Sequence, residues 1–188
     1  MKKRITFLLL LTGFISFYAQ KNIGNLSFEK VENKLPTDWK IFGEGQATIS
    51  VDNTEKQSGN SSAIIESPDT TGFKALAFTL PSNYEGEKIT LTGYIKTENI
   101  TEGFAGLWMR IDPEIAFNNM QEKKLQGTNP WKKYEITLNL DPAKTQKIVI
   151  GALLTGKGKM WVDNLQVLID GTPFEKAKIY EKVFTKAD

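Results

Sequence analysis

The 188-residue chain contains no cysteine and no histidine. These two absences exclude disulfide frameworks, thiol nucleophiles, zinc sites built on Cys or His, and catalysis that uses imidazole as a base. Long apolar runs are scarce too, because the most apolar stretch, residues 5–17, is shorter than the ~20 residues that a membrane-spanning helix needs. With 40% hydrophobic and 24% charged residues, the chain has the composition of a soluble globular protein. Few reaction types remain open to it.

The first 19 residues have the layout of a secretory signal peptide. Lys2, Lys3 and Arg4 form a basic start, an apolar run follows, and Ala19 is a small residue ahead of Gln20. A membrane anchor is the alternative, and the short run favours a cleaved signal. We therefore predict a secreted or periplasmic protein of a bacterial cell envelope, since a eukaryotic secreted domain of this size more often carries disulfides.

Removal of this segment changes the charge balance. The 24 basic residues fall to 21 without Lys2, Lys3 and Arg4, against 22 acidic residues, so the mature chain has a net charge near −1. Lysines and glutamates are interspersed, and no basic block remains. A nucleic-acid partner needs a positive face, so we expect none, and we expect no membrane contact after cleavage.

From residue 20 to about 170 the dominant hydrophobic period is two, which is typical of half-buried strands. Alternation is clearest at 47–51, 89–95, 107–111 and 136–140, while the more continuous apolar runs predict strands covered on both faces (75–80, 148–154 and 160–169). Turn residues separate these stretches, and no helical stripe is present. We predict an all-β domain, a two-sheet antiparallel β-sandwich of the jelly-roll type, over residues 20–170. Residues 171–188, rich in Lys and Glu, are expected to form a linker or a short helix.

A candidate binding face follows from the strand alternation. Trp108 and Arg110 point away from the side that Leu107, Met109 and Ile111 present to the core. If Tyr94 lies on a neighbouring strand, the three side chains form an aromatic-plus-guanidinium platform. Such a platform suits a sugar, because aromatic rings cover C–H surface and arginine offers a rigid donor fork.

The alternative is that Trp108 packs beneath a loop while Arg110 pairs with Asp112 or a nearby glutamate. We interpret the remaining tryptophans as packing residues (Trp39, Trp131 and Trp161). The composition also permits one enzyme class, a glycosidase built on two carboxylates, for which Asp112 and Glu114 are the candidates.

Three stretches resemble carbohydrate-binding-module jelly rolls of families 4, 9 and 22, within the galactose-binding-like superfamily. They are NLSFE at 25–29 with LPTDW at 35–39, SGNSSA at 58–63, and MWVDNL at 160–165. Further segments, among them GLWMRID at 106–112 and FNNM at 117–120, are similar to an accessory domain that precedes secreted tail-specific serine peptidases and erythromycin-esterase-like proteins of Bacteroidetes-type bacteria. Such a domain is also appended to some regulators.

The resemblance implies a structural Ca²⁺ held by Glu29 and Asp163, together with carbonyls of the turn near Gly59. It also implies a non-catalytic accessory module whose partner is a glycan. Two other functions stay open at this point: a domain that packs against a neighbouring hydrolase without binding sugar, and a small glycan-active enzyme.

Overall fold

The computed structural model of the protein describes residues 24–180, so the predicted signal peptide at 1–19 lies outside the described residues. Within that range there is no α-helix, and no helix that is long and apolar enough to span a membrane. The strands are β1 (Val31–Glu32), β2 (Leu35–Pro36), β3 (Lys40–Phe42), β4 (Thr48–Asp52), β5 (Ser62–Ser67), β6 (Phe73–Leu80), β7 (Lys88–Asp112), β8 (Ala116–Asn118), β9 (Leu125–Asn139), β10 (Lys147–Thr155), β11 (Lys157–Ile169) and β12 (Thr172–Pro173). Two 3₁₀ turns complete the elements, η1 (Gln121–Lys123) and η2 (Phe174–Lys176).

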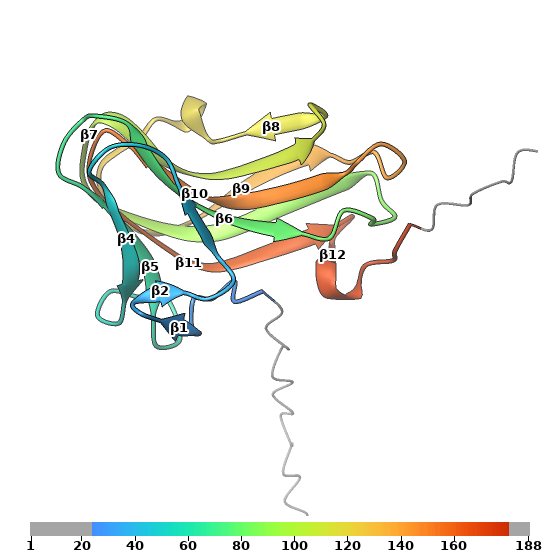
Figure 1. Cartoon of the computed structure of the whole chain (residues 1–188), viewed down its shortest axis with the longest axis horizontal. Helices are drawn as coiled ribbons and strands as arrows, with labels where there is room; N and C mark the ends of the chain where they lie inside the picture. The colour runs from blue at the N-terminus through green and yellow to red at the C-terminus, as the bar shows by residue number, and fades with distance from the viewer. Residues whose placement is uncertain (1–23, 181–188) are drawn as a thin grey trace, which may run out of the picture.

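The strands form two packed layers that share β7 (Figure 1). Sheet I has the order β3-β6-β10-β7-β8 and uses residues 105–112 of β7. Sheet II has the order β4-β5-β11-β7-β9 and uses mainly residues 88–101 of β7, with β12 folded back onto β11. Every pairing is antiparallel, which confirms the predicted β-sandwich.

β7 is one strand of 25 residues where the alternation indicated two separate strands. Asn99 and Glu102 have φ angles of 53° and 54°, and the register against β9 shifts around them. Left-handed residues and bulges bend a strand without ending it. At this bend, a Cβ on Gly103 would meet the carbonyl oxygen of Thr155. β7 and the end of β10 can therefore approach closely there only because Gly103 lacks a side chain.

The core lies between the two sheets and contains the predicted inward residues of each strand. Leu107, Met109 and Ile111 are fully buried, as are Ile89 and Leu91 on the other half of β7. β10 is buried at every position from Ile148 to Leu154, as its continuous apolar run predicts. Its outward residues Val149 and Leu153 pack with Ala75 and Trp108 in a second, smaller apolar cluster on the outer face of sheet I.

The C-terminal segment packs against the sandwich as far as residue 180 and contains the short 3₁₀ helix η2, while the predicted domain boundary at 170 stays a prediction. Phe174 in η2 is buried and joins the main core. Ile179 pairs with Tyr84, and the amide of Glu85 donates to the carbonyl of Lys178 at 2.8 Å. These contacts could not be predicted from hydrophobic periodicity, because one buried phenylalanine and a two-residue strand are too short to show a period.

Candidate functional site: an aromatic groove on sheet I

The outer face of sheet I carries a groove of about 340 Å³, and five of its eleven lining residues are aromatic. We call it the aromatic groove and define it by Phe42, Phe73, Phe104, Trp108 and Phe117, with Ala75 and Leu153 between them. Strand pairing places these residues together: Phe42 is opposite Ala75, Ala75 is opposite Leu153, and Phe117 is opposite Arg110. Four polar residues also line it (Arg110, Asn119, Gln121 and Thr155).

Trp108 forms the inner wall of the groove and is only 4% exposed. Its indole Nε1 donates to the carbonyl oxygen of Leu76 at 3.0 Å. Gly151 lies opposite Trp108 on β10, and a Cβ there would be 2.5 Å from Nε1, so the glycine makes room for the indole to reach β6. Phe42 covers the indole edge-on, with ring centroids 5.5 Å apart at 76°. The predicted orientation of Trp108 away from the main core is therefore confirmed, but its ring is not an open platform.

The accessible aromatic surface belongs instead to three phenylalanines that the sequence reasoning missed. Phe42, Phe73 and Phe117 are 41%, 37% and 57% exposed. Phe42 and Phe73 also contact each other edge-to-face at 5.9 Å. Only Phe73 had a readable signal, because it shares strand parity with Ala75 and Ala77, opposite to the core residues Leu76 and Leu80. Phe42 and Phe117 sit on strands of three residues, which are too short to reveal a face.

Arg110 lies on the same face as Trp108, as predicted, and is clamped by Asp112. Its Nε is 2.9 Å from Oδ1 of Asp112, and its Nη2 donates to Oδ2 at 3.2 Å. This is the pairing that the alternative interpretation anticipated. The clamp fixes the guanidinium at the edge of the groove and balances its charge. It also engages both oxygens of the Asp112 carboxylate.

Tyr94 is not part of this site, so the predicted three-residue platform is wrong in its third member. Tyr94 pairs with Asp163 on β11 and with Lys133 on β9, which places it in sheet II. Trp108 and Arg110 lie on the half of β7 that belongs to sheet I. Because the outward sides of the two sheets face away from each other, alternation alone could not bring Tyr94 to the groove.

The outer face of sheet II has a different character, because it carries several ion pairs. Lys96 forms an ion pair with Glu55 at 2.6 Å, and Lys159 lies within 3.8 Å of both Glu66 and Glu98. Trp161 is buried beneath Lys96, whose Nζ is 5.3 Å from the ring centroid, as expected for a packing residue. A face of mutually paired charges is well solvated. Exposed aromatic side chains gather instead on the outer face of sheet I.

Glu29 and Asp163, the expected calcium ligands, do meet at the 57–61 turn, but as hydrogen-bond acceptors. Oδ2 of Asp163 accepts the amides of Gln57 and Ser58, each at 2.9 Å, and Oδ1 accepts that of Asn164 at 2.6 Å. Oε1 of Glu29 accepts the amides of Asn60 and Ser61 at 2.9 and 3.4 Å. We call this arrangement the carboxylate lock.

The carboxylate lock does not match a calcium site, because Ca²⁺ needs 6–8 oxygen ligands and the turn presents N–H groups to both carboxylates. Within residues 24–180, no group of three or more acidic side chains gathers where it could hold a metal. Burial raises the pKa of Asp163 above its usual 3.8, against the lowering effect of its three amide donors, and the nearby Glu29 adds to the rise. The sequence resemblance therefore predicts Ca²⁺ at this turn while its amide donors argue against the ion, and melting with and without calcium tests the two.

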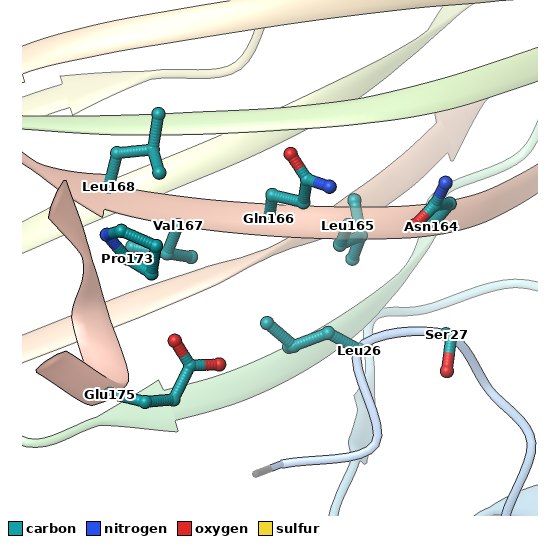
Figure 2. Close-up of a pocket in the computed structure, with 9 residues that line it drawn as sticks. All are labelled: Leu26, Ser27, Asn164, Leu165, Gln166, Val167, Leu168, Pro173 and Glu175. Carbon is teal, nitrogen blue, oxygen red and sulfur yellow. The ribbon is translucent and has the colours of Figure 1, made fainter. Parts of the chain in front are cut away.

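A separate pocket of about 250 Å³ lies where the N-terminal segment, β11 and η2 meet (Figure 2). Leu26, Leu165 and Glu175 come from these three elements, and the amide of Leu165 donates to the carbonyl of Leu26 at 3.0 Å. A bulge in β11 between Asp163 and Gln166 opens the space. Glu175 is the one charged group in its lining. Burial, together with the nearby charge of Glu175, raises the pKa of Tyr84 to about 12. We interpret this pocket as a packing gap between the two terminal segments and not as a binding site.

Several solved carbohydrate-binding modules have the same β-sandwich fold. The structure is similar to the module TmCBM61 in complex with β-1,4-galactotriose, with a TM-score of 0.58 and 15% identity over 77% of this chain and 95% of that one. It is also similar to the CBM22-1 xylan-binding domain of Paenibacillus barcinonensis Xyn10C, with a TM-score of 0.52 and 12% identity over 76% of this chain and 90% of that domain. At these identities the likeness shows the fold.

At the level of sequence, no family model matches the chain. A stretch of 147 residues is 27% identical to an uncharacterized HTH-type transcriptional regulator, YbfP, of Bacillus subtilis (strain 168). The alignment covers 73% of this chain and 49% of the regulator, so the chain spans about half the length of the curated relative that it matches.

Proposed function

We propose that the chain is a non-catalytic binding module of an exported protein and that it holds a glycan-containing ligand in the aromatic groove. One observation carries the proposal: exposed phenylalanine rings gather on the outer face of sheet I, while the outer face of sheet II shows paired charges. Exposed apolar surface of this kind marks a binding site, since monomeric proteins otherwise keep such patches small.

Binding would be passive. Phe117 and Phe73 offer ring faces to the apolar C–H surface of a ligand. Arg110, held in place by Asp112, directs its remaining N–H groups from the edge of the groove, beside Asn119 and Gln121. Even weak binding is useful in a module, because a covalently attached partner then experiences a high effective concentration of the ligand.

The proposal draws support from proteins of the same fold, of which one is described in complex with galactotriose and another as xylan-binding. The signal-like residues 1–19 are consistent with work outside the cytoplasm. An attached hydrolase, such as a tail-specific peptidase or an erythromycin-esterase-like protein, is the partner that the sequence resemblance implies.

A glycan array probed with the purified chain tests the proposal. The Phe117→Ala variant should bind at least about tenfold more weakly to any glycan that is found, because an exposed ring that contacts the ligand contributes on the order of 1.4 kcal/mol. Its melting temperature should stay close to that of the wild type. Tyr94→Ala on the opposite face is the matched control and should leave the affinity unchanged. Absence of glycan binding, or equal affinities for the wild type and Phe117→Ala, would overturn the proposal.

A second candidate is a domain that packs against a neighbouring protein through the same groove. The three exposed phenylalanines favour it, because protein interfaces are also built around exposed aromatic residues. In that case the array shows no binding, and Phe42, Phe73 and Phe117 become protected from solvent only when the partner is present.

A further inference from the structure

We propose that the ligand is a neutral sugar that carries an apolar substituent, an alkyl, acyl or aryl group, and that this substituent occupies the aromatic groove. This inference rests on the proposed function and specifies the chemistry of the ligand at the same site.

The first argument is the hydrogen bonding of the groove wall. Nε1 of Trp108 is already used by the carbonyl of Leu76. Oγ1 of Thr155 accepts the amide of Phe104 at 3.0 Å and lies 3.4 Å from its carbonyl oxygen. Three further polar residues, Arg110, Asn119 and Gln121, lie at one edge of the groove, and the remaining lining side chains are apolar. A bare sugar ring carries hydroxyls around its whole edge, and hydroxyls that lose water without finding a partner weaken binding. An alkyl chain or an aryl ring has no such requirement.

The second argument is that polar partners lie beyond one side of the groove. A neighbouring hollow of about 590 Å³ shares Phe117, Asn119 and Gln121 with the groove and continues past η1 as far as Glu135. The residues on either side of η1, Met120 and Lys124, have left-handed φ angles of 59° and 46°, which turn the chain sharply at this point. The surface is thus mainly apolar on one side of Phe117 and mixed, with many polar side chains, on the other, which suits a ligand with an apolar and a polar part.

The third argument is charge. The cation of Arg110 is balanced by the bidentate contact with Asp112. The adjoining hollow contains two lysines and two glutamates, Lys123, Lys124, Glu122 and Glu135. Because neither part has an excess of one sign, the site is complementary to a neutral ligand rather than to an acidic one.

The test compares methyl and octyl β-glycosides of glucose, galactose and xylose by isothermal titration calorimetry, below the micelle concentration of each octyl glycoside. We expect the octyl glycoside of at least one sugar to bind ten times more tightly than its methyl counterpart or better. Phe117→Ala should remove most of this gain. Val31→Ala, which shortens an exposed apolar residue on β1, is the matched control and should keep it.

The outcomes separate the two proposals. Equal affinity for methyl and octyl glycosides, with a loss in Phe117→Ala, overturns this inference and leaves the proposed function standing. An octyl gain that is the same in the wild type and in Phe117→Ala means adsorption elsewhere and also overturns it. If no glycoside and no glycan on the array binds, the proposed function fails and the inference fails with it. Hexanol, an alkyl probe without a sugar, should bind more weakly than the octyl glycoside. Equal binding would show that the sugar contributes no affinity and would overturn the inference.

Discussion

Substitution of Asp163 by alanine should destabilise the protein strongly, because one carboxylate holds the 57–61 turn against β11. The side chain is fully buried and accepts three backbone amides. Each buried donor left without a partner costs roughly 1–3 kcal/mol, and water entering the vacated space satisfies some of them. We therefore expect a loss of about 2–4 kcal/mol. At about 2–4 °C per kcal/mol for a domain of this size, the melting temperature should fall by roughly 5–15 °C.

The assay is urea unfolding followed by tryptophan fluorescence, with the slope against urea checked for constancy. Asp163→Asn retains one acceptor oxygen and should lose less, about 1–2 kcal/mol. Glu66→Gln, in a partly exposed ion pair with Lys159, is the control and should change the free energy of unfolding by less than about 0.5 kcal/mol. If Asp163→Ala unfolds at the same urea concentration as the wild type, the carboxylate does not hold the turn and the reasoning is wrong.

Three further predictions concern the same structure. The carboxylate lock already satisfies Glu29 and Asp163 with amides, so melting temperatures measured with about 5 mM calcium and with about 5 mM chelator should lie within about one degree of each other. A larger rise with calcium would show that these carboxylates bind the ion. Burial raises the pKa of Asp163 above 3.8, so the pH-dependent part of its contribution to stability is present below 3.8 and is lost as the pH rises through the raised pKa, while the hydrogen bonds to the three amides remain. The wild type should accordingly gain stability relative to Asp163→Asn between neutral pH and pH 4 in paired melting curves, and a constant difference would contradict the shift. Trp108→Ala should lose about 3–5 kcal/mol in urea unfolding and Phe117→Ala less than about 0.5, since one ring is buried and the other exposed; similar losses would disprove this division of roles.

The strands were predictable because their signal is local. Alternation at 89–95, 107–111 and 136–140 depends on neighbouring residues only, and each stretch has its apolar side in the core. That two of these stretches belong to one strand was not predictable, because the bulges at Asn99 and Glu102 are set by pairing with distant strands.

The site was predictable in part for the same reason. Parity along β7 correctly put Trp108 and Arg110 on one outward face, but parity does not say to which sheet Tyr94 belongs. The contacts that matter most, Phe42 over Trp108 and Phe117 opposite Arg110, join residues far apart in sequence through strands of only three residues. Glu29 and Asp163 were correctly expected at one turn, while the donors that they meet there depend on the orientation of individual peptide groups.

The passage of β7 through both layers has a mechanical consequence. Its 25 residues act as a common spine, so the layers cannot slide or part without breaking the hydrogen-bond ladders along that segment. The walls around Phe104 and Trp108 are therefore anchored to the same backbone that holds the opposite side of the molecule. This part of the groove is therefore preorganised, and the protein loses little conformational entropy when a ligand binds.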